Sequence, residues 1–283
     1  MRSQITSWLS NWDAFVPGAP PPRYSVLRLT PELERGLIDC AIAGITALIV
    51  LLLARRRAPE LLRDLPIAEL RGIIQIVIVG AILAFLLHGP RWVSVPVLGA
   101  MVLAAANIVR NRAKQIQQPF PMILCAILGG AGSILFLMAV TRVIPMTIAI
   151  LVPVGSMVIA NTMNTLSLFL DRLRGEVASH VGEIESALAL GASPDTALTP
   201  GINAAYRACL IPSIDNIRSL GIVWIPGIMA GMVLSGSSPL FAALYQFVVL
   251  TTIFAAAALT CFIASLMVTR RLFSRHEQLL LRG

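Results

Sequence analysis

Polar side chains inside one apolar run are the first residues of this sequence whose spacing suggests chemistry. Met157, Asn161 and Asn164 recur at i, i+4 and i+7, so a helix here carries a thioether and two amides on one face. Two interpretations stay open. These side chains line a path and contact a transported solute, or they form hydrogen bonds between helices, as Asn often does in a bilayer.

A later apolar run has small residues at a spacing that suits close packing. Gly227 and Gly231 stand four residues apart, and such a pair lets a second helix approach closely. Met229, between them, is assigned to the same path-lining set as the first group. Methionine sulfur binds soft transition metals, but methionine also fills apolar cores. Whether the chain holds a metal therefore stays open.

Four polar residues at the ends of apolar runs are expected to have structural roles. Arg71 and Gln75 are one helical turn apart, and Arg71 either extends to the lipid headgroups or pairs with Glu69 or another helix. Asp215 and Arg218, at i and i+3, are expected to form an ion pair where the chain enters a later apolar segment from the cytoplasm.

The sequence lacks the motifs of several enzyme classes. There is no G-x-x-x-x-G-K-[ST] loop, so the chain is not expected to bind ATP through a P-loop. No H-E-x-x-H or G-x-S-x-G motif occurs, so no catalytic residue and no cofactor of its own are expected. A carrier driven by protons or sodium usually has a carboxylate in mid-membrane. The acidic residues near the apolar segments lie instead at segment ends: Asp39, Glu69, Asp171 and Asp215.

The composition indicates an all-α protein that crosses a membrane several times. Hydrophobic residues make up 57% of the 283 residues and charged residues only 13%, against about 25% charged in soluble domains. Spanning a bilayer takes about 20 apolar residues. Seven segments qualify, at residues 36–54, 66–87, 92–109, 121–140, 145–170, 217–235 and 239–268.

Arginine clusters between the segments predict the orientation. Most of them fall on one side, which the positive-inside rule makes cytoplasmic. The C-terminus is then cytoplasmic and, after seven crossings, the N-terminus is outside. Residues 36–283 form the transmembrane domain, and residues 1–35 form a tail. Ile5, Trp8, Leu9 and Trp12 recur at helical spacing there, so the tail is either a helix on the membrane surface or disordered.

The longest non-membrane stretch, residues 171–216, is expected to form a cytoplasmic loop of two short helices broken at Gly191–Pro194. It contains the pattern E-x-A-x-x-x-G, from Glu185 through Ala187 to Gly191. This pattern is similar to the core of the loop through which bacterial ABC permeases contact their ATPase. The residues expected to make this coupling contact are Glu183, Glu185, Ala187, Leu190, Gly191 and Ala192. In importer permeases this pattern continues with a proline at a set distance. Here the next proline-bearing match, Leu210-Ile211-Pro212, comes later in the chain, which disfavours an importer.

Several short motifs occur in a fixed order over roughly residues 65–275: Arg71-Gly-Ile-Ile-Gln75, Ile144-Pro145-Met146, Leu190-Gly191-Ala192-Ser193-Pro194, Leu210-Ile211-Pro212 and Tyr245-Gln246. With them the chain resembles the FetB (YbbM) family of permeases, which includes the plant aluminium-tolerance permeases of the ALS/STAR type. The resemblance implies a homodimeric permease of the bacterial inner membrane.

The same resemblance implies a separate FetA-like subunit that binds ATP and magnesium. It also implies export of iron, with UDP-glucose as the alternative suggested by the plant members. The competing classes are a secondary carrier and a membrane scaffold without transport activity. Binding of an ATPase subunit would distinguish an ATP-driven permease from a secondary carrier and from a scaffold.

Overall fold

The computed structural model describes residues 31–54, 61–86, 93–113, 116, 118–143 and 148–272. Its described residues are helical apart from short turns and one isolated bridge between Leu220 and Trp224. The all-α expectation is therefore confirmed. The chain divides into two compact units, residues 1–85 and 86–283, which are described separately. The expected boundary between tail and membrane domain, at residue 35, stays a prediction, and the tail's expected surface helix lies outside the described residues.

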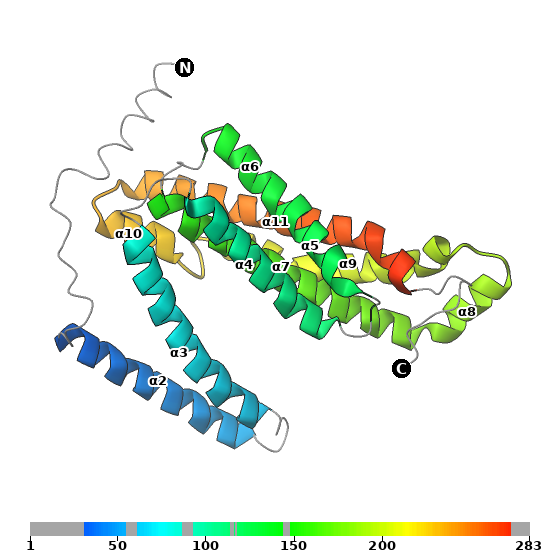
Figure 1. Ribbon diagram of the computed structural model, residues 1–283, viewed down its shortest axis with the longest axis horizontal. Coiled ribbons are helices and arrows are strands. Elements are labelled where there is room, and N and C mark those ends of the chain that lie inside the picture. The colour runs from blue at the N-terminus through cyan, green and yellow to red at the C-terminus, as the bar shows by residue number, and fades with distance from the viewer. Residues whose placement is uncertain are drawn as a thin grey trace. The chain divides into compact units, whose positions relative to one another are not determined.

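The first unit contains helices α2 (Pro31–Ala54) and α3 (Leu61–Leu86) (Figure 1). Both coincide with expected apolar segments, although each helix begins about five residues earlier than expected. The two helices touch where Gly44 of α2 faces Glu69 of α3, because a side chain at Gly44 would lie 3.3 Å from the Glu69 carboxylate. A glycine therefore makes room for a charged group in this pair of helices.

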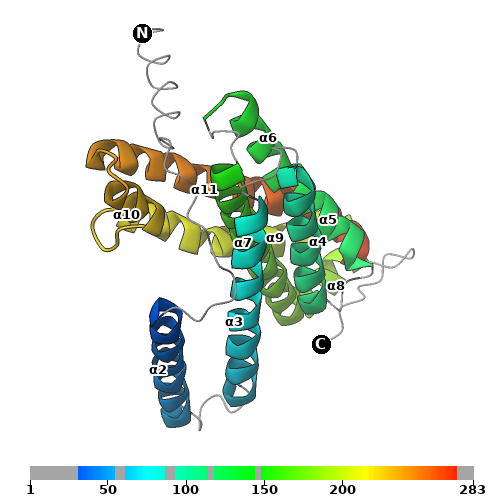
Figure 2. The same ribbon diagram turned by 60° about the vertical axis from the view of Figure 1, so that its left-hand side comes forward.

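The second unit is a helical bundle organised around two long helices (Figures 1 and 2). Helix α7 contacts α4, α9 and α11, while α11 also contacts α10 and the α5–α6 segment. The elements of this unit are α4 (Ser94–Arg112), α5 (Pro119–Ile127), the π-helical turn η3 (Leu128–Gly132), α6 (Ser133–Val140), α7 (Ile148–Ser179), α8 (Val181–Ala189), α9 (Pro194–Ser219), α10 (Gly227–Leu234) and α11 (Pro239–Leu272).

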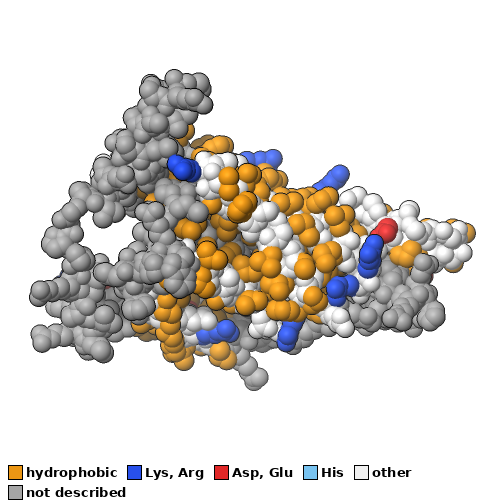
Figure 3. Space-filling model, turned by 45° about the horizontal axis from the view of Figure 1, so that its top comes forward, with side chains coloured by type: hydrophobic (Ala, Val, Ile, Leu, Met, Phe, Trp, Pro, Cys, Tyr) orange, Lys and Arg blue, Asp and Glu red, His pale blue; other side chains and the backbone are white. Residues whose placement is uncertain are grey.

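Among the residues that the structure describes, four helices are long and apolar enough to cross a membrane: Ser94–Arg112, Pro119–Val140, Ile150–Ser179 and Pro239–Leu272. They correspond to the expected third, fourth, fifth and seventh segments, and the expected total of seven is not confirmed. Hydrophobic side chains cover much of the surface shown in Figure 3. Such exposed apolar surface suits contact with lipid.

The expected sixth segment, 217–235, is not one helix. Helix α9 ends at Ser219, a turn follows with Gly221 at φ +75°, and α10 begins only at Gly227, directly after Pro226. The positive φ of Gly221 interrupts the helix. Pro226 has no backbone N–H, so it cannot donate the hydrogen bond that would continue the helix across the gap. The prediction of one continuous span here is wrong.

The expected cytoplasmic loop, 171–216, is mostly helical, and its cytoplasmic position stays a prediction. Helix α7 runs on to Ser179 without a break. The short helix α8 and the turn at residues 190–193 then separate α7 from α9. Helix α9 then continues for 26 residues and packs along α7 and α11. Leu198, Ala205 and Cys209 of α9 are almost fully buried in these contacts. The stretch is therefore mostly part of the bundle, because one face of α9 is apolar.

Backbones approach closely where the π-helical turn crosses α11. A side chain at Gly130 would come within 2.5 Å of the backbone nitrogen and 2.6 Å of the Cα of Thr260. Only glycine fits such a crossing. The π-turn, whose hydrogen bonds span one residue more than those of an α-helix, is a rare local distortion inside a helix.

Candidate functional site

Helix α8 carries the expected coupling motif at the end of the bundle away from α10 (Figure 1). Its outer residues Glu183, Glu185 and Leu190 are exposed, and Leu190 is 89% exposed. Ile184 is buried and holds the helix against its neighbours. The motif therefore forms a short helix with an exposed outer face that a partner could contact. The exposed side chain of Leu190 stands at the end of this face.

The end of α8 is a Schellman motif that explains the glycine of the pattern. The Gly191 N–H donates to the Leu188 carbonyl (2.9 Å), and the Ala192 N–H donates to the Ala187 carbonyl (3.0 Å). This arrangement requires a left-handed residue directly after the helix, and Gly191 has φ +89°. Ser193 then caps α9 by accepting from the Thr196 N–H (3.3 Å). Each turn between α8 and α9 is thus fixed by local hydrogen bonds.

The ends of α4, α7 and α11 meet the start of α5 at one end of the bundle. Arg112 lies 3.8 Å from Asp171, and Arg271 donates to the Gln118 carbonyl. We call this the basic end, defined by Arg110, Arg112, Arg172, Arg174, Arg270 and Arg271.

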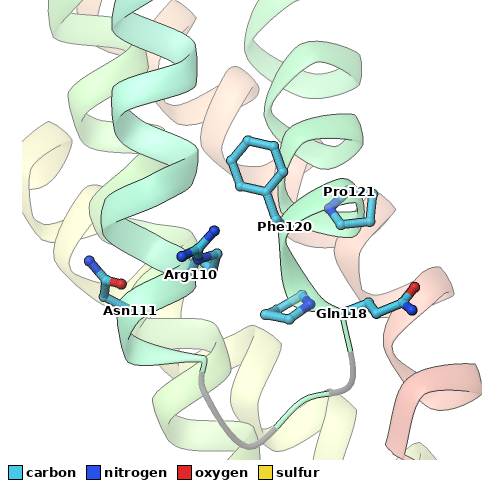
Figure 4. Close-up of a pocket in the computed structure, with 6 residues that line it drawn as sticks. Arg110, Asn111, Gln118, Phe120 and Pro121 are labelled. Atoms are coloured by element: carbon cyan, nitrogen blue, oxygen red, sulfur yellow. The ribbon is translucent and has the colours of Figure 1, made fainter.

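A hollow of about 510 Å³ lies at the basic end between α4 and α5. Figure 4 shows Arg110 and Phe120 extending into the space between these helices, whereas Asn111 and Gln118 point away. All of its lining residues lie at the last turn of α4 or the start of α5. The hollow is therefore a surface feature of the basic end and not a passage through the bundle.

The stripe expected to line a path lies on α7. Asn164 is exposed, while Met157 and Asn161 are half-buried. The Asn161 side chain donates to the Met157 carbonyl (3.0 Å), and the Asn161 carbonyl accepts from Thr165 (2.9 Å). One amide of the pair thus bonds within its own helix and the other faces outward. The lining role of the stripe stays a prediction.

Met229 is placed by a buried side chain from another helix. The Met229 N–H, in the first turn of α10, donates to the Gln246 side chain of α11 (3.3 Å), and Gln246 is only 1% exposed. Gln246 thus satisfies one N–H that the helix start leaves without an intrahelical partner. Side chains added at Gly227 or Gly231 would meet no atom within 4 Å among the described residues. Their expected packing role stays a prediction.

Two pairs were expected to be structural. Asp215 and Arg218 form the expected ion pair (3.6 Å), and their expected position at a cytoplasmic entry stays a prediction. They lie in the last turns of α9, which runs back along the bundle away from α8. Arg71 and Gln75 are exposed on α3, and the ion pairs found in the described part of the chain do not include Arg71 with Glu69.

The polar face of α9 was missed from the sequence. Asn203 and Arg207 are exposed, on the side of α9 opposite its buried residues. The signal was present, because polar or proline residues recur at helical spacing through Thr196, Pro200, Asn203 and Arg207. In the described residues no group of three or more His, Cys, Asp or Glu side chains is placed to hold a metal ion.

Comparison with known proteins identifies the family. The model of the uncharacterised protein family UPF0014 matches residues 37–273. The "UPF0014 membrane protein YjkA" of Bacillus subtilis (strain 168) is 31% identical over 247 residues, which cover 86% of this chain and 97% of that protein. The "Probable iron export permease protein FetB" of Escherichia coli (strain K12) is 30% identical over 244 residues, covering 84% of this chain and 93% of that protein.

The similarity extends to plants. The "Protein ALUMINUM SENSITIVE 3" of Arabidopsis thaliana is 26% identical over 247 residues, covering 87% of this chain and 90% of that protein. No solved structure matches the chain. Since the family model covers most of the sequence and bacterial relatives match over nearly their whole length, the chain belongs to the UPF0014 family of membrane permeases.

Proposed function

We propose that this protein is the permease subunit of an ATP-driven ABC exporter of the bacterial inner membrane. The observation that carries the proposal is α8, a short helix with an exposed outer face at the end of the bundle where arginines gather. A separate FetA-like subunit would bind ATP and magnesium and receive α8 in a groove. Leu190 would be the apolar anchor of that contact, since buried apolar anchors usually dominate binding energy at interfaces.

The geometry supports transmission of motion from α8 into the membrane. The α7 helix that precedes α8 is continuous for 32 residues, and α9 follows after a tight turn. Close to α8, helices α7 and α9 touch, because a side chain at Gly201 of α9 would lie 3.5 Å from the Cβ of Glu176 of α7. A push on α8 would therefore move α7 and α9 together as one rigid body, as alternating access requires.

The basic end supports a cytoplasmic position for α8 and for the C-terminal end of α11, by the positive-inside rule. If α9 and α10 together make one broken crossing, the chain crosses seven times and the N-terminus is outside. Two copies of the chain would form the transport path, with the α7 stripe of Met157, Asn161 and Asn164 beside it. Iron is the cargo suggested by the name of the FetB relative.

The test compares two leucines that are equally exposed at opposite ends of the bundle. Leu190 and Leu234 are each 89% exposed, at the ends of α8 and α10. The permease is co-expressed with its candidate ATPase, and complex formation and ATP turnover in liposomes are measured. Leu190→Ala should weaken binding of the ATPase by about tenfold or more, the usual effect of losing an apolar anchor.

Leu234→Ala should leave both the complex and its turnover unchanged. If the ATPase does not bind the unaltered permease, or binds Leu190→Ala equally well, the coupling role of α8 is refuted. A secondary carrier or a scaffold would then be the better description.

A further inference from the structure

The two faces of α9 differ in a way that a helix surrounded by lipid cannot sustain. One face is buried against α7 and α11 through Leu198, Ala205 and Cys209. The opposite face exposes Asn203 and Arg207. Charged side chains within membrane helices usually face a water-filled cavity or another protein surface, since exposure to lipid is costly.

A hydrogen bond fixes the depth of this face in the bundle. The Tyr206 hydroxyl donates to the Ala258 carbonyl of α11 (3.2 Å). Ala258 precedes Arg270, at the basic end of α11, by about 18 Å at 1.5 Å per residue. The hydrocarbon core of a bilayer is about 30 Å thick. If Arg270 marks the headgroup level, the backbone beside Arg207 lies near the middle of the membrane.

Arg207 differs from the other arginine of α9 in its surroundings. Arg218 pairs with Asp215 on its own helix, whereas none of the ion pairs found among the described residues includes Arg207. A guanidinium presents two parallel N–H groups that match the oxygens of a phosphate or carboxylate. Asn203, one turn earlier on the same face, adds an amide that donates hydrogen bonds.

We propose that Arg207 and Asn203 form an anion-binding site on the transport path, so that the exported cargo carries phosphate or carboxylate oxygens. This inference rests on the proposed transport function and narrows its cargo. A bare ferrous cation would be repelled by Arg207. Iron would instead pass as an anionic chelate, and a sugar nucleotide would bind through its phosphates.

The experiment uses the full permease in nanodiscs and, separately, its complex with the ATPase in liposomes. Equilibrium binding to the permease alone is measured with ferric citrate, UDP-glucose and ferrous chloride. ATP turnover of the complex is measured with the same three solutes. We expect at least one of the two anions to bind and to stimulate turnover, and ferrous chloride to do neither.

Arg207→Gln should raise the dissociation constant of that anion by about tenfold or more, as expected for a lost charge-assisted hydrogen bond. Arg207→Lys should retain most of the affinity, because it keeps the charge. Arg172→Gln, which removes an exposed arginine near the end of α7, is the matched control and should bind normally. Asn203→Ala should weaken binding less than Arg207→Gln.

Three results would overturn the inference: ferrous chloride binding better than either anion, anion binding that is unchanged in Arg207→Gln, or a loss of folding in both Arg207→Gln and Arg207→Lys. The last would mean that Arg207 pairs with an acidic group of the protein. If the ATPase fails to bind but anion binding depends on Arg207, the proposed ABC mechanism is wrong and the anion site stands.

Discussion

Replacing Gly130 by alanine should separate α11 from the helices that precede it. The added Cβ would lie 2.5 Å from the backbone nitrogen and 2.6 Å from the Cα of Thr260, and it would also strike the Thr260 hydroxyl. Carbon atoms in contact prefer about 3.5–4.0 Å, so the two backbones must move apart by roughly 1 Å. A backbone cannot rotate away as a flexible side chain can.

The cost can be estimated from overpacking and helix propensity. Overpacking a core costs about 1–3 kcal/mol, and this site belongs at the upper end because backbone atoms clash. Alanine recovers about 1 kcal/mol through its higher helix propensity than glycine. The net loss is about 2 kcal/mol, which corresponds to a fall of about 4–8 °C in the unfolding midpoint of a domain of this size.

The assay is thermal unfolding of the purified permease in detergent. Gly132→Ala is the matched control, because a side chain there meets no atom within 4 Å and lies in the same π-turn. It should leave the midpoint unchanged or raise it slightly. Equal midpoints for the two variants would refute the close crossing. Full rescue of Gly130→Ala by Thr260→Ala would show that only the hydroxyl, and not the backbone, is in the way.

Two further predictions concern the ends of short helices. Gly191→Ala forces a side chain into φ +89°, so it should cost about 1 kcal/mol in stability and lower ATP turnover of the complex. Gly182→Ala, with open space around it, is the control and should change neither. Equal turnover in the two variants would argue that the angle at which the chain leaves α8 is not fixed by Gly191. Gln246→Leu removes the acceptor of the Met229 N–H, so it should cost about 1–3 kcal/mol and speed hydrogen exchange in the first turn of α10. The same substitution at exposed Gln75 is its control, and unchanged exchange in α10 would contradict the capping role.

Much of the coupling helix could be predicted from the sequence because its determinants are local. The break between α8 and α9 follows from Gly191, which takes a left-handed conformation, and from Ser193-Pro194, which cap and start the next helix. Each acts within one turn of its own position. The exposure of the motif could not be deduced this way, since it depends on how Ile184 packs against neighbouring helices.

For the residues expected to line a path, the sequence predicts the helix face but not the hydrogen-bond partners. Helical spacing correctly puts Met157, Asn161 and Asn164 on one side of α7, but spacing cannot say that the Asn161 amide bonds to its own helix. Average hydropathy likewise hides α9, because its polar face cancels its apolar face and leaves a segment that resembles a loop. Only the contacts with α7 and α11 reveal that the segment belongs to the bundle.

The sequence alone determined that the chain is helical and lives in a membrane, since a chain with 57% hydrophobic and 13% charged residues cannot expose its surface to water. It also determined some helix limits, such as the start of α11 at Pro239 and the end of α8 before Gly191. The tertiary structure decided which side of α9 is buried, where Gly130 meets Thr260, and that Gln246 supports α10. These contacts join residues far apart in the chain, and burial and hydrogen bonding between them arise only when the helices pack.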